Sequence, residues 1–160
     1  MSIFNQYSFL WLALAVTVIA ALVFLRRKPR LPDFLAVGVV LLALLTAWLL
    51  LRPRQTILSD EAAEVQARIG QGTPVLLEFQ SPYCLACTAI KPPVDRLEAQ
   101  YAGRLIVLRV NVQSQAGREL AAVYGFQYTP TFIFFDAAGQ ERWREVGGLT
   151  PERLEQSLSP

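Results

Sequence analysis

The sequence predicts an α/β protein with a mixed β-sheet flanked by helices, preceded by a hairpin of two transmembrane helices. Two observations carry this prediction. Residues 9–25 and 34–51 are apolar runs, and the only polar side chain in each is a threonine, Thr17 or Thr46. Beyond residue 51, apolar segments of strand length alternate with segments of helical periodicity, which is typical of α/β folds.

Each apolar run is just long enough to cross the hydrocarbon core of a bilayer as a helix. A pair of buried soluble helices is the alternative, but two helices that are apolar all round would leave too little polar surface. Residues 1–8 carry no Lys or Arg, whereas a secretory signal peptide has basic residues before its apolar run. We therefore expect an uncleaved hairpin over residues 1–51, with the lipid bilayer as its environment.

The link between the two runs is basic and indicates their orientation. It contains Arg26, Arg27, Lys28 and Arg30, while the far side of the second run offers only Arg52 and Arg54 nearby. The positive-inside rule then makes the link cytoplasmic, so residues 52–160 face the extracytoplasmic side of the cytoplasmic (inner) membrane. With Asp33 the link has a net charge of +3, which leaves about −1 for residues 52–160 and indicates no nucleic-acid surface.

Residues 52–58 are predicted to form a short tether and residues 59–160 a globular domain. Its first helix is capped by Ser59 and ends near Ile69. Short segments bounded by turn residues, most of them apolar, predict strands at residues 75–79, 105–110, 131–135 and 140–146. Helices are predicted at residues 88–101, 117–124 and 151–158, the first of them interrupted by Pro92-Pro93. The two strands joined through the first of these helices should lie parallel.

Cys84 and Cys87 are the only cysteines, and they stand where a strand pattern gives way to a helical one. A thiolate at a helix N-terminus is stabilised by unpaired N–H groups, so this pair suits thiol–disulfide exchange. A zinc site would need about four ligands, which two cysteines and no histidine do not supply. A structural disulfide would stabilise the fold by only roughly 2 kcal/mol across so short a loop. Two buried, inert thiols are the third alternative.

The dithiol at a helix start, the proline in that helix and the Thr129-Pro130-Thr131 turn before a hairpin resemble the thioredoxin family over about residues 59–158. The resemblance implies a thioredoxin fold for the domain and, with the hairpin, a membrane-anchored thioredoxin-like protein. It also implies that Cys84 is the nucleophile and Cys87 the resolving thiol of a redox-active disulfide. Pro92 matches the family's helix-kinking proline.

The same resemblance implies the substrate-binding residues Tyr83, Thr129 and Pro130. Pro130 would be a cis-proline, and Thr129 would lie against the dithiol and offer its backbone to a substrate. An ordinary trans proline before a strand is the alternative. This sequence departs from the family in having Tyr83 for tryptophan, Leu85-Ala86 for Gly-Pro and Thr129 for isoleucine.

Glu78 stands where the family usually carries a buried aspartate beneath the dithiol. Burial would raise the pKa of its carboxyl and make it a base for Cys87. An outward-facing glutamate on a half-exposed strand is the alternative. Arg109, where the family often has a lysine near that acid, would favour the ionised form of Glu78, unless it is a solvated surface arginine.

These features predict a membrane-tethered thiol:disulfide oxidoreductase acting on extracytoplasmic protein substrates. We expect a reductant, because no histidine or charge lies between the cysteines. Similar anchored family members suggest apocytochrome c thiols, and hence cytochrome c maturation, as one substrate. Two helices without a cysteine or charge do not carry electrons, so we expect a separate membrane electron donor. We expect no cofactor. The alternatives are a disulfide oxidase or isomerase and a non-catalytic interaction module of a membrane complex.

Overall fold

The structure, a computed structural model, describes residues 3–26, 34, 37–39, 41–42, 46 and 62–159 of the chain. The predicted tether and the Ser59 cap lie outside these residues. The chain divides into two compact units, one made of Met1–Ser8 and Gln55–Pro160 and the other of Phe9–Arg54. Each unit is described by itself.

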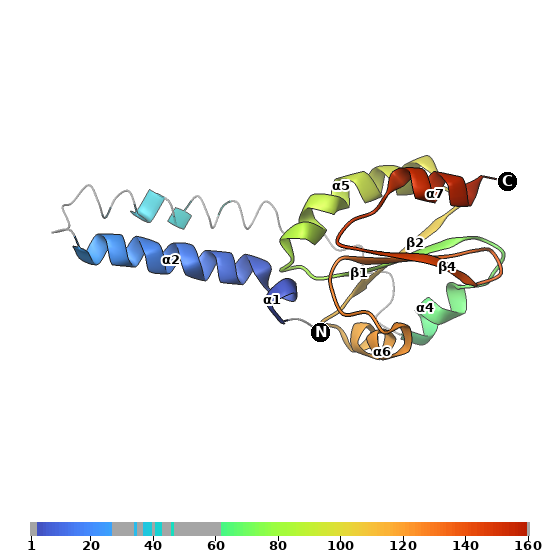
Figure 1. Ribbon diagram of the computed structural model, residues 1–160, viewed down its shortest axis with the longest axis horizontal. Helices are drawn as coiled ribbons and strands as arrows, with labels where there is room; N and C mark the ends of the chain where they lie inside the picture. Colours follow the sequence, from blue (N-terminus) through green and yellow to red (C-terminus); the bar gives the residue numbers. More distant parts are fainter. Residues whose placement is uncertain are drawn as a thin grey trace. The chain divides into compact units, whose positions relative to one another are not determined.

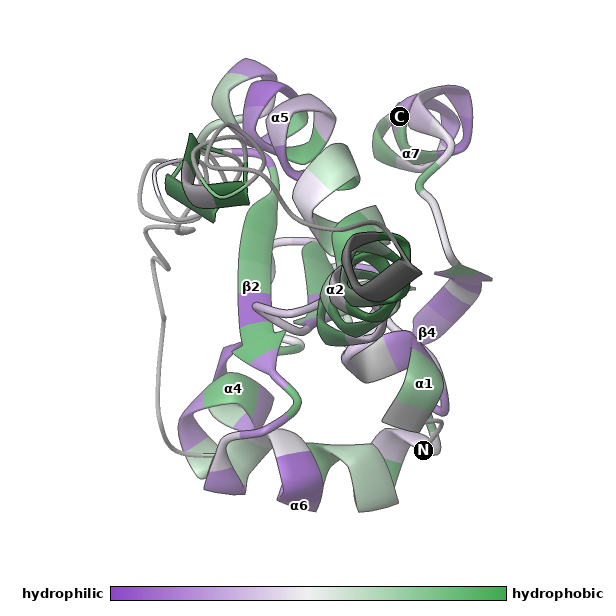
Figure 2. Cartoon of the chain, turned by 90° about the vertical axis from the view of Figure 1, so that its left-hand side faces the viewer, coloured by the Kyte–Doolittle hydropathy of each residue, from purple (hydrophilic) through white to green (hydrophobic). Residues whose placement is uncertain are grey.

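The Phe9–Arg54 unit contains most of α2 (Ser8–Arg26), a helix of 19 residues at the place of the first predicted apolar helix. Figure 2 shows α2 as predominantly hydrophobic. Among the residues that the structure describes, no helix combines the length and the apolar character that crossing a membrane requires. The described residues therefore do not support the predicted transmembrane hairpin. The second predicted helix, residues 34–51, lies mostly outside them.

The other unit is built on a four-stranded sheet in the order β2-β1-β3-β4 (Figure 1). Its strands match the predicted segments to within one residue: β1 (Val75–Gln80), β2 (Ile106–Asn111), β3 (Thr131–Phe135) and β4 (Glu141–Val146). β1 runs parallel to β2, whereas β3 is antiparallel to both β1 and β4. The predicted mixed sheet, with its parallel pair joined through a helix, is confirmed.

Helices cover both faces of this sheet, because successive side chains of the central strands point to opposite sides. On one face, α4 (Ala62–Arg68) and α6 (Gln115–Tyr124) pack on a core that includes Leu77 and Phe79. On the other face, α5 (Leu85–Gln100) and α7 (Pro151–Leu158) pack on a core that includes Leu76 and Phe132 (Figure 1). A four-residue helix, α1 (Ile3–Gln6), belongs to the same unit.

Helix α5 differs from its prediction in two ways. It begins at Leu85, three residues early, and it continues through Pro92 and Pro93, so the predicted interruption is wrong. A proline removes one backbone hydrogen bond from a helix interior. Val94 and Leu97 follow the prolines and are buried against the sheet, and their packing stabilises the helix beyond the prolines.

Helix α6 starts close to the end of β2, and only glycine fits at the contact. The Ser114 hydroxyl donates to the Asn111 carbonyl at 2.7 Å and accepts from the Gly117 N–H at 3.0 Å, which caps the helix. A Cβ atom on Gly117 would collide with the same Asn111 carbonyl oxygen. Gly117 therefore fixes how closely α6 approaches the sheet.

Candidate active site

The dithiol lies where β1 ends and α5 begins. A turn after β1 is closed by the Cys84 N–H, which donates to the Ser81 carbonyl at 3.2 Å. Cys84 is the N-cap of α5, and its Sγ accepts from the Cys87 N–H at 3.3 Å. The sulfur thus occupies the place that a serine or aspartate oxygen takes at other helix starts. Both cysteines are free thiols in the structure.

The pKa values of the two thiols are shifted in opposite directions. The pKa of Cys84 is lowered from 9.0 to about 6, first by the side-chain hydrogen bond with Cys87, against the opposing effect of burial. The Thr129 side chain and the N–H groups of Cys87 and Ala86 act in the same direction as Cys87. The same side-chain hydrogen bond, together with burial, raises the pKa of Cys87. Cys84 is therefore mostly a thiolate at neutral pH, with Cys87 as its hydrogen-bond donor. This difference is what an attacking and a resolving thiol require, although the two roles stay predictions.

The Thr129–Pro130 peptide bond is cis, as expected. Because β1 and β3 are antiparallel, the end of β1 and the start of β3 lie at the same edge of the sheet, where Phe79 is paired with Thr131. Thr129 is brought against the dithiol in this way, and the Cys84 thiol donates to its carbonyl at 3.5 Å. Tyr83, which precedes Cys84 in the chain, is exposed. The structure thus brings the predicted substrate-binding residues Tyr83, Thr129 and Pro130 together around Cys84.

Glu78 and Arg109 are buried partners on neighbouring strands, so the outward-facing and solvated alternatives are wrong for both. Glu78 is 1% exposed and Arg109 is 7% exposed. Arg109 donates to the Glu78 carboxylate at 3.2 Å and also pairs with Asp95 and Glu98 of α5, at 2.8 and 2.7 Å. Burial raises the pKa of Glu78 to about 7, against the opposing effect of the Arg109 charge.

Glu78 shares the α5 face of the sheet with Leu76, two residues before it. Among the described contacts, its carboxyl group bonds to Arg109 and to neither sulfur. A pKa near neutrality suits a group that takes up and releases protons. The role of Glu78 as the base for Cys87 stays a prediction, and Arg109 is the residue that holds its carboxylate in place.

Several residues at the site were not singled out from the sequence. The Ser81 hydroxyl accepts from the Tyr83 N–H at 3.2 Å and from the Gln113 side chain at 2.9 Å, so it fixes the turn that leads to Cys84. Residues 5–8 also reach the site. A serine before a proline at a strand exit is a local turn signal, but no local pattern relates residues 5–8 to a turn about 80 residues away.

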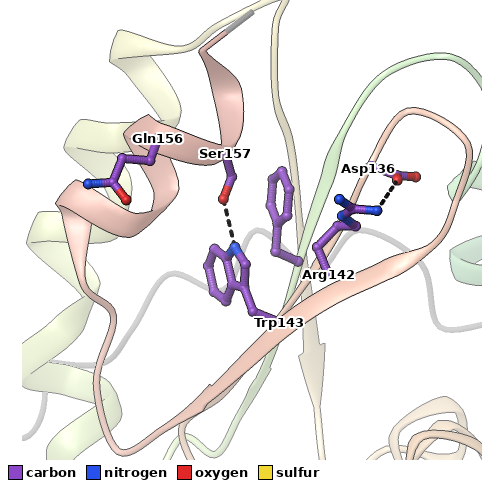
Figure 3. Close-up of a pocket in the computed structure, with 6 residues that line it drawn as sticks. Asp136, Arg142, Trp143, Gln156 and Ser157 are labelled. Atoms are coloured by element: carbon purple, nitrogen blue, oxygen red, sulfur yellow. Dashed lines mark hydrogen bonds and ion pairs between the residues drawn. The ribbon is translucent and has the colours of Figure 1, made fainter.

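A pocket between β4 and α7 lies at the other end of β3 and takes no part in this site. It is lined by Phe134, Asp136, Arg142, Trp143, Gln156 and Ser157 (Figure 3). The Trp143 indole N–H donates to the Ser157 hydroxyl at 2.8 Å, which joins the strand to the helix. In the part of the chain that the structure describes, no three Cys, Asp or Glu side chains are close enough to hold a metal ion.

The sequence profile of the thioredoxin family matches residues 56–160. The chain belongs to the thioredoxin family. With its Cys84–Cys87 pair it is a thiol:disulfide oxidoreductase, and the family implies protein thiols and disulfides as its substrates. The profile covers the predicted domain of residues 59–160 and begins three residues before it.

Relatives of known name agree with this membership. The chain is 33% identical over 85 residues to thioredoxin 1 of Chlorobaculum tepidum, which covers 53% of the chain and 81% of that protein. It is 32% identical over 93 residues to thioredoxin 1 of a Nostoc species, covering 58% and 84%. It is 26% identical over 102 residues to a chloroplastic thioredoxin-like protein of Arabidopsis thaliana, covering 64% of this chain but 39% of that protein.

Proposed function

We propose that this thioredoxin-family chain is tethered to the cytoplasmic membrane and reduces disulfides in extracytoplasmic proteins. The pKa of Cys84 is the observation that favours reduction over oxidation of substrates. Its pKa of about 6 lies nearer to that of thioredoxin, about 7, than to that of the strong oxidant DsbA, about 3.5. A less stabilised thiolate gives a less oxidising dithiol, so the couple favours donating electrons to substrates.

The two apolar runs and the basic link of the sequence support the tether and its orientation. Electrons for a reductant on the outer side must come from across the membrane, and these runs hold no cysteine or charged residue to carry them. The proposal therefore includes a separate membrane protein as electron donor. Apocytochrome c thiols, and so cytochrome c maturation, are one candidate substrate among the extracytoplasmic proteins.

The reduction potential of the Cys84/Cys87 couple tests the direction. Equilibration of the full chain in glutathione or dithiothreitol redox buffers should give a value nearer to about −270 mV, as in thioredoxin, than to about −120 mV, as in DsbA. Reduction of insulin by the wild type, but not by Cys84→Ser, should accompany it. A value near the DsbA end would make the protein an oxidase, and a chain that reduces no disulfide at any potential would be a docking module.

Labelling with a membrane-impermeant thiol reagent tests the location. After mild reduction, intact cells that express the chain should be labelled, and the Cys84→Ser variant should lose the label. Labelling only after lysis would place the domain on the cytoplasmic side. Recovery of the chain in the soluble fraction, rather than with membranes, would contradict the tether itself.

A further inference from the structure

Residues 5–8 of the chain lie beside the dithiol, where Asn5, Tyr7 and Ser8 make three hydrogen bonds and one ring contact. The Asn5 side-chain oxygen accepts from the Thr129 N–H at 2.6 Å and from the Thr129 hydroxyl at 2.9 Å. The rings of Tyr7 and Tyr83 are stacked, with centroids 5.6 Å apart and planes 22° apart. The Ser8 hydroxyl accepts from the Leu85 N–H at 3.2 Å. These residues belong to the same compact unit as the rest of the site.

All four interactions are made to groups that border Cys84. Thr129 holds the carbonyl to which the Cys84 thiol donates, and Tyr83 and Leu85 precede and follow Cys84 in the chain. The Leu85 N–H belongs to the first turn of α5, where backbone donors have no partner within the helix. The Thr129 N–H is a backbone donor that an extended substrate segment would need for strand-like pairing. Residues 5–8 thus satisfy the donors that an incoming protein would use.

Access to the sulfur is closed in this arrangement. Cys84 is 1% exposed in the folded chain. Thiol–disulfide exchange requires the thiolate to attack a substrate sulfur directly, so the substrate must reach the Cys84 sulfur itself. At this exposure a substrate sulfur reaches Cys84 only after the groups around it move, and residues 5–8 hold three of those neighbours: Thr129, Tyr83 and Leu85.

We propose that residues 5–8 form a tethered cover over the dithiol that competes with protein substrates for the Thr129 N–H and the Tyr83 ring. The inference rests on the proposed function, because the cover competes for the face on which substrates dock. Since the segment is part of the same chain, its return to the site is intramolecular and does not depend on the protein concentration. Its few contacts still let a substrate with an extended backbone displace it. The cover thereby protects the reactive Cys84 thiolate from small oxidants between turnovers.

Alkylation of Cys84 by iodoacetamide in the reduced full chain, held in detergent micelles, tests the cover without needing a substrate. The rate is measured across a pH series, and the modified residue is identified by mass spectrometry. The triple variant Asn5→Ala, Tyr7→Ala, Ser8→Ala should raise the plateau rate at high pH by about tenfold or more, since it removes three hydrogen bonds and one ring stack. The single variant Asn5→Ala should give a smaller rise.

Thr17→Ala is the matched control, because the Thr17 hydroxyl donates to Ala13 within α2. It should leave the alkylation rate unchanged. An unchanged plateau in the triple variant would overturn the cover, as would an equal rise in the Thr17→Ala control. A shift of the pH midpoint without a higher plateau would also overturn it, since Asn5 would then act on thiol acidity and not on access.

Insulin reduction by the same variants separates this inference from the proposed function. An active cover predicts a lower KM for the triple variant with little change in kcat. If no variant reduces insulin, the proposed function fails while the alkylation result still decides whether residues 5–8 cover the sulfur.

Discussion

Replacing Cys87 with alanine should raise the pKa of Cys84, because Cys87 supplies the largest single stabilisation of the Cys84 thiolate. Without the Cys87 thiol, Cys84 keeps the backbone N–H groups of the first helical turn as donors, so the pKa should stay below 9.0. We expect the midpoint of the alkylation pH profile near 6 in the wild type and at least about one unit higher in Cys87→Ala.

The effect of a lowered pKa on the alkylation rate of Cys84 depends on two opposing quantities, the fraction of thiolate and the nucleophilicity of that thiolate. A pKa of about 6 in place of 9.0 raises the thiolate fraction at neutral pH from about 1% to about 90%. Nucleophilicity falls with thiol basicity, and a Brønsted coefficient of about 0.4–0.5 over three units costs roughly 20-fold. Relative to a cysteine with the ordinary pKa of 9.0, the net gain at neutral pH is therefore about fivefold. Well above pH 9, where both thiols are ionised, the wild type should react more slowly than Cys87→Ala.

Rapid-mixing alkylation of the reduced protein across a pH series measures the midpoint, with Cys84→Ser as the control for labelling elsewhere. Cys87→Ser retains a side-chain donor, so its midpoint should lie between those of the wild type and Cys87→Ala. A wild-type midpoint above about 8, or one that Cys87→Ala leaves in place, would refute the hydrogen-bond account of Cys84 acidity.

Two further predictions concern the buried acid and the close approach of α6. Burial raises the pKa of Glu78 from 4.5 to about 7, so the folded state favours the protonated carboxyl. As the pH rises from 4.5 to 7, the free energy of unfolding of the wild type should fall by up to about 3 kcal/mol. Glu78→Gln should remove this pH dependence, measured by urea unfolding, and should also slow the resolution of mixed disulfides by Cys87. If the unfolding free energy of the variant varies with pH as in the wild type, the first effect is contradicted. Gly117→Ala should destabilise the domain by roughly 1–3 kcal/mol through collision with Asn111, whereas Gly148→Ala, with open space around it, should have little effect in the same titration.

The strands were predictable because their signals are local. Val75, Ile106 and Thr131 each begin an apolar or β-branched segment bounded by turn residues, and the structure places strands there. The helix after the dithiol was predicted less well, since local propensity treats Pro92-Pro93 as a break. Propensity does not include the burial of Val94 and Leu97 beyond the prolines, and that burial decides the outcome.

The site was predictable as far as the chain itself places residues side by side. Cys84 and Cys87 are neighbours in sequence, and the family resemblance supplied the turn at Pro130. The burial of Glu78 depended on whether its strand is central, and its pairing with Arg109 across β1 and β2 settled that question. The Asn5–Thr129 contact spans 124 residues with no repeating pattern, so only the folded chain reveals it.

Most groups that touch the sulfur of Cys84 belong to the backbone or to Cys87. Cys87 donates through its N–H and its thiol, and the Thr129 carbonyl accepts from the thiol form. This chain departs from the usual residues of its family at positions 83, 85 and 129. Tyr83 and Leu85 contribute exposed side chains to the docking face, whereas Thr129 is buried and its side chain lowers the pKa of Cys84. Tyr83 and Leu85 are exposed there, and both lie under residues 5–8 through a ring contact or a backbone N–H. The departures at positions 83 and 85 should therefore alter which partners dock, the chain's own residues 5–8 among them, more than they alter the exchange reaction, whereas Thr129 acts on the acidity of Cys84.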